Sequence, residues 1–316
     1  MAAPLQKILI AGATGSVGAP ILTALLSEPT FQVTILTRAS SSATFPPNIP
    51  ITTVSDAYTL PELTAAFKGH DAVVSAISTG PATKDDLAFR IVDAALAAGV
   101  RRLIPSEFGA NNLDPRATAL VPVYERKGQM LRYLIEKAGQ SGGRLAWTSI
   151  ACGSWLDWGL DPKKSGNFLG IDVKGRKAVV WDSGLARFAC TTSESTGRAV
   201  VRALKAGEGT ANKQVFLADF TTSVRGVLEC LERLTGDKWE IEEKESAGAI
   251  KELRERFDGG EFEATFPLLA LSFVADVDVG YDFEKEYKVW NEDLGMEKQT
   301  LEEVVKRVLE KEGAAP

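Results

Sequence analysis

The sequence predicts an α/β fold in which a doubly wound parallel sheet is joined by a smaller α+β lobe. Through the first 150 residues, short apolar runs alternate with stretches whose apolar residues recur at helical spacing. Strands that are apolar along their whole length are typical of parallel sheets covered by helices on both faces. After about residue 150 the alternation becomes irregular, and tryptophan and phenylalanine are scattered among glycine and aspartate.

The elements follow from this pattern in chain order. Strands of the first half are expected over residues 7–11, 31–36, 51–54, 72–77, 102–105 and 145–150. Helices of the first half are expected over residues 17–26, 60–67, 85–98 and 123–138, where apolar side chains share one face. In the second half, strands are expected at 179–181 and 239–241, and helices at 194–204, 220–234, 247–257 and 301–309.

Composition narrows the class of function. Lys and Arg total 36 against 42 Asp and Glu, for a net charge of −6, which argues against nucleic acid as a partner because phosphate binding needs a concentrated basic surface. Cys152, Cys190 and Cys230 are far apart and form neither a disulfide framework nor a metal motif. We therefore expect a reducing, cytoplasmic location. No secretory signal or membrane-spanning stretch is expected.

A glycine-rich loop directly follows the first strand and opens the first helix. It reads Gly-Ala-Thr-Gly-Ser-Val-Gly over residues 12–18. In such loops one glycine permits the turn, a second lets the backbone approach a pyrophosphate, and a third lets the helix pack closely. The free amides and positive end of the helix then attract phosphate. This predicts a Rossmann-type dinucleotide site with the contacts Gly12, Thr14, Gly15, Ser16, Val17 and Gly18.

Arg38 points to the choice of cofactor. It follows the second strand, where NAD-specific proteins usually place an acidic residue for the ribose hydroxyls. A guanidinium there suits a 2′-phosphate, which it binds through charge-assisted hydrogen bonds. The serines at 40–42 offer further donors, so the sequence predicts NADP(H). The alternative is a solvated arginine in a serine-rich loop.

Other candidate cofactor contacts also follow strands, because ligands of such sheets bind outside the carboxyl ends of the strands. Ser75, Ala76 and Ile77 end the fourth strand and are expected to lie under the cofactor. Asp56 follows the third strand, and we expect it either to accept from the adenine amino group or to cap the next helix.

Few residues are candidates for the chemistry. The single histidine, His70, precedes a strand and so lies at the wrong end of the sheet, which argues against Ser-His-Asp catalysis. The Tyr-x-x-x-Lys pair of short-chain dehydrogenases is absent, because Tyr124 lies three residues before Lys127 and not four. Lys127 itself lies early in a helix on the cofactor side, where burial would suit it to donate a proton. A lysine in such a place is nevertheless more often solvated.

Together these motifs resemble the isoflavone reductase-like, NmrA-like branch of the atypical short-chain dehydrogenase/reductase superfamily. The resemblance rests on the glycine loop, Arg38, the Pro-Ser-Glu-Phe-Gly run at 105–109, and a Val-x-x-x-Lys spacing that ends at Lys127. Residues 148–160 are similar to those of fungal members. The resemblance is strong over residues 7–160 and looser beyond them.

The resemblance implies an NADPH-dependent reductase of small aromatic, phenylpropanoid or polyketide-like compounds in secondary metabolism. It implies that Lys127 is the catalytic residue, which orients the nicotinamide ribose and assists proton transfer. Cofactor contacts are implied for Ser106, Glu107 and Phe108, although Glu107 serves equally well as a structural hydrogen-bond acceptor. The resemblance also implies substrate contacts for Phe108, Trp155, Trp158 and Phe168. For each of these residues, burial in the core is the alternative.

One segment departs from the family pattern. Ser-Glu-Ser-Thr-Gly at 193–197 stands where Asp-Ile-Gly is expected before a helix, which leaves the substrate unspecified. Two other functions stay open: a redox-sensing regulator that binds NADP without turnover, and an isomerase or cyclase that uses NADP as a scaffold.

The sequence predicts two parts of the chain with different roles. Residues 1–152 are expected to form the NADP-binding Rossmann domain, with a returning helix near 193–205. Residues 153–316 are expected to form mainly a substrate-binding lobe. The expected partner is a small aromatic substrate, without nucleic acid, membrane or metal. The oligomeric state stays open, a homodimer included.

Overall fold

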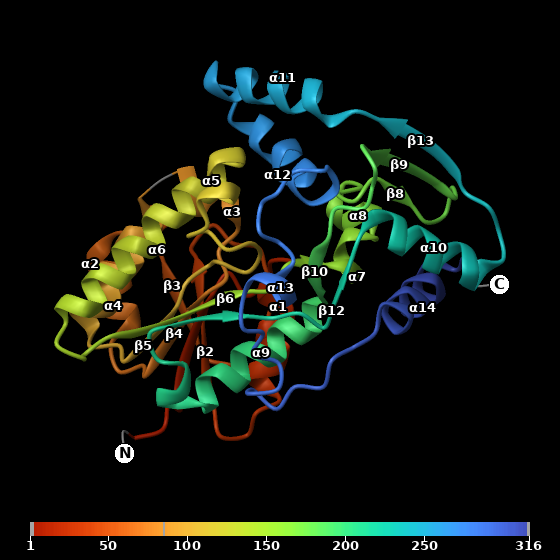
Figure 1. The fold of residues 1–316 in the computed structure, drawn as a ribbon. Coiled ribbons are helices and arrows are strands. Elements are labelled where there is room, and N and C mark those ends of the chain that lie inside the picture. Colours follow the sequence, from red (N-terminus) through yellow and green to blue (C-terminus); the bar gives the residue numbers. More distant parts are fainter. Residues whose placement is uncertain (1–2, 85, 315–316) are drawn as a thin grey trace.

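A parallel sheet lies at the centre of the protein, whose computed structural model describes residues 3–84 and 86–314. The sheet has seven strands in the order β11-β6-β5-β4-β1-β2-β3, and all neighbouring strands run parallel (Figure 1). The strands are β1 (Lys7–Ala11), β2 (Gln32–Arg38), β3 (Ile51–Val54), β4 (Ala72–Ser75), β5 (Arg102–Ile104), β6 (Ala146–Ala151) and β11 (Lys213–Phe216). The predicted α/β fold is thus confirmed.

Helices cover both faces of the sheet because its strands are apolar on both sides. In β1, Ile8 and Ile10 pack into the core on one face, whereas Leu9 packs into the core on the other. The helices on the first face are α1 (Gly18–Leu26) and α9 (Ser193–Lys205), and those on the second are α2 (Leu60–Phe67), α4 (Leu87–Ala98) and α6 (Pro122–Gln140). Asp85, where α4 was expected to begin, lies outside the described residues.

The seventh strand, β11, was not predicted. It comes from the second half of the chain and pairs with β6, so that Val215 lies opposite Ile150. Its sequence, Lys-Gln-Val-Phe, is short and half polar, as suits an edge strand, and shows no clear strand pattern. The helix before it, α9, packs on α1. The two helices can approach closely because Gly197 has no side chain, since a Cβ there would lie only 2.6 Å from the Pro20 carbonyl oxygen. Both halves of the chain therefore build the central sheet and its helices.

Two small sheets and several short helices make up the rest of the structure. One sheet joins β12 (Phe220–Thr222), β10 (Phe188–Thr191) and β7 (Ser154–Trp155), and the other joins β13 (Glu240–Lys244), β9 (Lys177–Trp181) and β8 (Ile171–Asp172). The remaining helices are α3 (Thr79–Lys84), α5 (Pro115–Leu120), α7 (Leu156–Gly159), α8 (Pro162–Ser165), α10 (Val224–Thr235), α11 (Ser246–Asp258), α12 (Thr265–Val274), α13 (Phe283–Glu286) and α14 (Leu301–Glu312), with 3-10 turns η1 (Gly207–Thr210) and η2 (Phe262–Ala264).

The helix predicted over residues 220–234 was wrong at its start. Residues 220–222 form β12, which pairs antiparallel with β10, and α10 begins only at Val224. The Ser223 side chain accepts a hydrogen bond from the amide of Gly226 and so caps the helix. The sequence also did not predict α12, because its residues are apolar all round and lack an amphipathic period.

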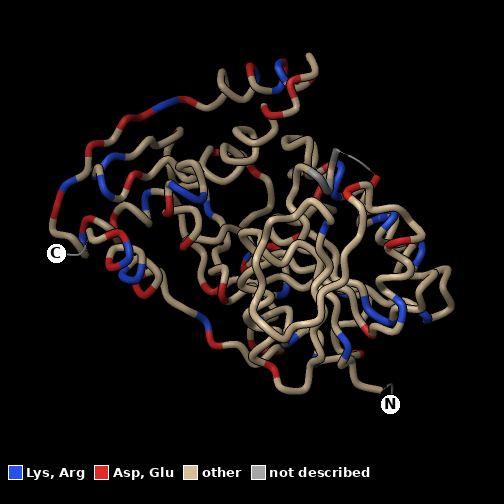
Figure 2. The backbone as a smooth tube through the Cα atoms, turned by 180° about the vertical axis from the view of Figure 1, so that it is seen from behind, with Lys and Arg blue, Asp and Glu red and all other residues tan. Residues whose placement is uncertain are grey.

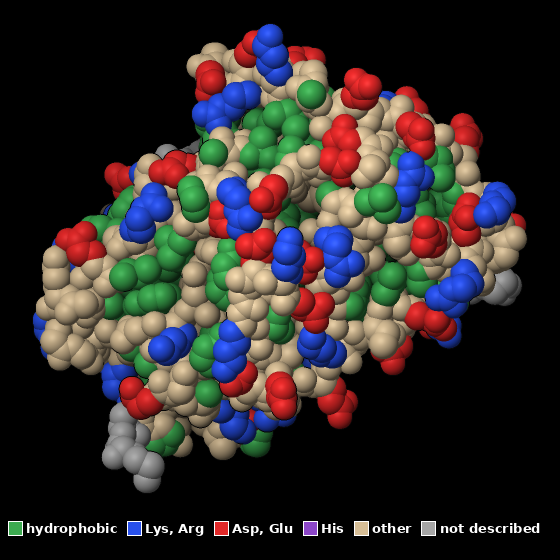
Figure 3. Space-filling view, viewed as in Figure 1, with side chains coloured by type: hydrophobic (Ala, Val, Ile, Leu, Met, Phe, Trp, Pro, Cys, Tyr) green, Lys and Arg blue, Asp and Glu red, His purple; other side chains and the backbone are tan. Residues whose placement is uncertain are grey.

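Positions of Lys and Arg and positions of Asp and Glu both recur along the chain, with uncharged stretches between them (Figure 2). The face drawn in Figure 3 shows the same mixture, and hydrophobic side chains gather on it near α12. No helix within residues 3–84 and 86–314 is long and apolar enough to cross a membrane.

Candidate active site

A cavity of about 710 Å³ lies at the carboxyl ends of β1, β4 and β5. Its walls on the sheet side are the glycine loop, residues 76–79 after β4, and residues 106–109 after β5. The opposite walls come from residues 153–158, residues 165–168 and α12. Strand ends from the first half thus face side chains from the second half across one cavity, as expected for a ligand site on a parallel sheet.

Two glycines of the loop are required by the packing of the protein itself. Gly12 has a φ of +80°, and a Cβ there would collide with the Ala76 carbonyl oxygen. A Cβ at Gly18 would collide with the Gly12 carbonyl oxygen. At Gly15, in contrast, a Cβ would make an ordinary contact of 3.4 Å with that oxygen. Gly15 lines the cavity, so its missing side chain leaves room for a ligand.

The first turn of α1 is open to a ligand. Val17 stands at its N-cap, and no side chain accepts a hydrogen bond from the amides there. Side chains do cap the N-termini of α2, α9, α10 and α14. Val17, Gly15 and Ser16 line the cavity, while Thr14 lies in an adjoining groove. Ala19 N already donates to the Gly15 carbonyl oxygen and Pro20 has no N–H, so the turn offers a phosphate the backbone amides of residues 16–18.

Arg38 ends β2, and its side chain is half exposed. Its guanidinium lies 3.8 Å from the carboxylate of Asp56, which also accepts a hydrogen bond from Ser40 Oγ. An exposed ion pair contributes only about 0–1 kcal/mol, so Arg38 is free to turn toward an anionic ligand. Asp56 does not cap α2, because Thr59 and Glu62 form a capping box there. The capping role considered for Asp56 is therefore wrong.

Of the three residues predicted at the end of β4, two reach the cavity. Ala76 and Ile77 line it, and Ser106 Oγ donates to the Ile77 carbonyl oxygen at 2.7 Å, which ties the end of β5 to the end of β4. Ser75 is buried and lines a smaller space against α4 and α6 instead. A cofactor contact from Ser75 stays a prediction.

Lys127 lies on α6 and lines the cavity, with its side chain only 7% exposed. Its Nζ donates to the Ser106 carbonyl oxygen at 2.8 Å and to that of Glu107 at 3.5 Å. Burial lowers the pKa of Lys127, and the nearby Glu107 carboxylate opposes this shift. The structure thus brings a buried amine to the edge of the sheet where the loops meet.

Glu107 is buried on the same wall as Lys127. Its Oε2 accepts a hydrogen bond from Asn112 Nδ2 at 2.7 Å. Burial raises the pKa of Glu107, while the charge of Lys127 and the hydrogen bond from Asn112 lower it. Sequence reasoning did not select Asn112, because nothing in the local pattern shows that its side chain meets Glu107.

Tyr124 also lines the cavity, although the sequence analysis set it aside. It lies one turn before Lys127 on α6 and is fully buried, and its hydroxyl is hydrogen-bonded to Tyr281. Burial raises its pKa well above the usual range, so the hydroxyl stays neutral. His70 lies in the turn before β4, with a ring nitrogen 3.3 Å from the Phe67 carbonyl oxygen, and does not line the cavity.

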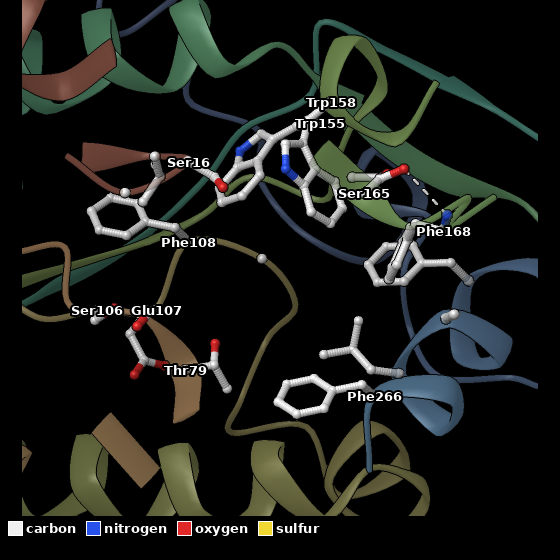
Figure 4. A pocket seen from close by; sticks show the side chains of 18 of the residues that line it. Ser16, Thr79, Ser106, Glu107, Phe108, Trp155, Trp158, Ser165, Phe168 and Phe266 are labelled. Carbon is white, nitrogen blue, oxygen red and sulfur yellow. Dashed lines mark hydrogen bonds between the residues drawn. The ribbon is translucent and has the colours of Figure 1, made fainter. Parts of the chain in front are cut away.

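Aromatic side chains from the second half of the chain line much of the cavity. Figure 4 shows Trp155 and Trp158 on one side of the cavity and Phe266 across from them. The Trp158 ring makes edge contacts with Trp155 at 6.2 Å and Phe168 at 5.6 Å between centroids. Phe108 completes the sheet side and is nearly buried. The predicted residues Phe108, Trp155, Trp158 and Phe168 therefore all line one cavity.

Two further aromatic residues of the cavity were missed. Phe266 and Phe273 belong to α12, more than a hundred residues after Lys127, and nothing in the local sequence marks them as cavity residues.

Trp155 does not offer a free polar atom, because its Nε1 donates to Thr196 Oγ1 at 3.0 Å and contacts Cys152 Sγ.

Comparison with known proteins shows to which family these residues belong. Residues 12–189 match the family model described as NAD(P)H-binding. The chain belongs to the NAD(P)H-binding family. Within that family, the oxidoreductase aprR of Aspergillus flavus is 32% identical over 304 residues, which cover 96% of this chain and 98% of that protein. The protein is thus related over its whole length to a fungal oxidoreductase.

Two solved structures share the fold of this NAD(P)H-binding protein. An isoflavone reductase has a TM-score of 0.73 at 20% identity, covering 96% of this chain and 99% of that one. The complex of leucoanthocyanidin reductase with NADPH from Vitis vinifera has a TM-score of 0.75 at 17% identity, with the same coverage. At these identities the likeness concerns the fold. The family match confirms the predicted NAD(P)H-binding domain, and the fold is that of isoflavone reductase-like proteins.

An NAD(P)H molecule suits the residues that the structure provides. The uncapped turn of α1 offers amides to a pyrophosphate, and the open side of Gly15 permits a close approach. Beyond the loop, the cavity continues past Lys127 to the aromatic wall, which is suited to a flat ligand. Among the described residues, no group of three His, Cys, Asp or Glu side chains is placed to hold a metal ion.

Proposed function

We propose that the protein is an NADPH-dependent reductase of a small, neutral aromatic compound of phenylpropanoid or polyketide-like character. One observation carries the proposal: the open turn of α1, the buried amine of Lys127 and an aromatic wall all border the same cavity. This arrangement supports a phosphate site, a proton source and a flat apolar surface within reach of one bound pair of molecules.

Charge narrows the class of substrate. Among the described residues that line the cavity, Glu107 and Lys127 are the charged ones, and both lie on the sheet side. The opposite wall consists mainly of aromatic, aliphatic and small residues. A charged substrate would lose its hydration there without a charged partner in return. A neutral ring system, in contrast, gains contact area with Trp155, Trp158 and Phe168.

The reduction needs a hydride and a proton. NADPH, when bound, supplies the hydride to an electron-poor carbon of the substrate. Lys127 then donates a proton from its ammonium group to the atom that gains the electron pair, and water restores the proton to the amine. Hydrogen bonds to the Ser106 and Glu107 carbonyl oxygens hold Nζ at the cavity wall. The enclosing aromatic side chains exclude bulk water from the reacting atoms.

The proposal is tested by NADPH oxidation with a panel of neutral and carboxylated aromatic compounds. We expect turnover with neutral compounds and little with their carboxylated analogues, followed by absorbance loss at the nicotinamide band and by mass analysis of the product. NADPH binding without turnover on any compound would favour the regulator. Product formation without net oxidation of NADPH would favour the isomerase or cyclase.

Replacing Arg38 with alanine tests the choice of cofactor. We expect NADPH binding to weaken by roughly 10- to 100-fold, because charge-assisted hydrogen bonds to the 2′-phosphate are lost, while NADH binding changes little. Calorimetry with both cofactors measures the difference. Arg144→Ala is the matched control, since Arg144 is exposed and precedes β6, at the opposite end of the sheet. Equal losses for NADPH and NADH would remove the phosphate role from Arg38.

A further inference from the structure

Asn112 and Glu107 form a buried contact beside Lys127. Asn112 is fully buried, and its Nδ2 donates to Glu107 Oε2 at 2.7 Å. The other end of the same amide, Oδ1, is buried and has no hydrogen-bond partner among the described residues. Leaving a buried acceptor unpaired costs free energy. The orientation that points the Asn112 N–H at the Glu107 carboxylate is thus kept although it leaves Oδ1 unpaired.

The backbone holds this contact against the helix that carries Lys127. Gly128 is the next residue of α6, and a Cβ there would collide with the Asn112 carbonyl oxygen. The missing side chain therefore lets α6 lie directly on Asn112. Its neighbour Asn111 anchors the same segment elsewhere, because Asn111 Oδ1 accepts from Gln214 Nε2 at 2.7 Å. Asn112 is thus fixed between the helix and the carboxylate.

Among the described residues, Glu107 and Cys152 are the titratable groups that act on Lys127, and Tyr124 lies one turn before it on α6. The negative charge of Glu107, after β5, favours the charged form of the lysine. Cys152 follows β6, and burial raises the pKa of its thiol to about 11, so it is neutral near pH 7. Burial also raises the pKa of Tyr124 on α6, so this group is neutral as well. Glu107 is therefore the group whose charge offsets the burial of the ammonium.

We propose that Asn112 is a positioning residue: its N–H keeps Glu107 ionised, and ionised Glu107 keeps Lys127 protonated for proton donation. This rests on the proposed role of Lys127 in the reduction. The direction of each effect on ionisation follows from two rules. A hydrogen bond donated to a carboxylate favours its ionised form, and a nearby negative charge favours an ammonium. Without either interaction the buried lysine loses its proton at a lower pH, and turnover falls at that lower pH.

The test measures the pKa of Lys127 in the full-length protein by NMR, with 13C at the lysine ε carbon and the Lys127 signal assigned by its loss in Lys127→Met. Glu107→Gln is expected to lower this pKa by about one unit or more, because it removes the compensating charge. Asn112→Ala is expected to lower it by less. Asn291→Ala, a matched change of a buried amide that donates to Asp219 Oδ1 at 3.0 Å and does not line the cavity, is expected to leave it unchanged.

The alkaline limb of the kcat profile is expected to move to lower pH in the same order. An unchanged Lys127 pKa in Glu107→Gln and Asn112→Ala overturns the proposal, as does an equal drop in Asn291→Ala. If Glu107→Gln does not fold, Asn112→Ala against Asn291→Ala decides the result. Should Lys127→Met keep full turnover while the NMR shifts appear as expected, the proton-donor role fails but the coupling of the three residues stands.

Discussion

Replacing Lys127 with methionine is expected to lower turnover by about 10²- to 10⁴-fold while NADPH binding stays nearly unchanged. The substitution removes the amine that we propose as the proton donor. It keeps an unbranched side chain of similar length, so the packing of α6 against the cavity wall is preserved. Turnover is measured by NADPH oxidation with the best substrate of the panel, and binding by calorimetry.

Lys137 provides the matched control on the same helix. Its Nζ lies over the Tyr133 ring at 5.2 Å, and it does not line the cavity. Lys137→Met should therefore retain turnover. Full activity in Lys127→Met would exclude the amine from the mechanism. A joint loss of turnover and NADPH binding would assign Lys127 to cofactor binding alone.

Adding one methyl group to the glycine loop is expected to lower the stability of the fold at Gly18 and the affinity for NADPH at Gly15. Gly18→Ala should destabilise the fold by about 1–3 kcal/mol or more, because its Cβ collides with the Gly12 carbonyl oxygen and backbone has little freedom to move. Gly15→Ala should leave the thermal midpoint nearly unchanged, because its Cβ makes an ordinary contact. It should instead weaken NADPH binding by roughly 10- to 100-fold, since the methyl group occupies the space of the ligand.

Thermal unfolding and calorimetry on the same samples separate these outcomes. Gly139→Ala serves as control, because Gly139 lies in α6 and a Cβ there meets nothing within 4 Å. That variant should be as stable as the parent protein or slightly more so, since alanine favours the helix. A normal NADPH affinity in Gly15→Ala would show that the pyrophosphate does not approach the loop at this residue.

The local features of the site could be predicted because they depend on neighbouring residues. The glycine loop needs only a strand, a turn and a helix in sequence, and the positive φ of Gly12 was expected from the turn. Lys127 could be placed on the cofactor side because the order of strand, loop and helix determines which edge of the sheet it reaches. These inferences required no knowledge of the second half of the chain.

The remaining parts of the site depend on contacts between distant residues. Phe266 reaches the cavity from α12, and Asn112 meets Glu107 from a loop that lies against Gly128 and is hydrogen-bonded to Gln214 through Asn111. No local spacing encodes such contacts. The capping role of Asp56 was wrong for a similar reason, because Thr59 and Glu62 compete for the same helix end and satisfy both sides of a capping box.

The sequence by itself determined the parallel sheet, its dinucleotide loop and the side of the sheet on which a ligand binds. These follow from apolar periodicity and backbone geometry, which act over a few residues. Only the tertiary structure decided that β11 completes the sheet, that α12 lines the same cavity as Lys127, and that Asn112 meets the Glu107 carboxylate. Burial and charge pairing are properties of the whole packed chain, because each depends on every segment that excludes water from the group.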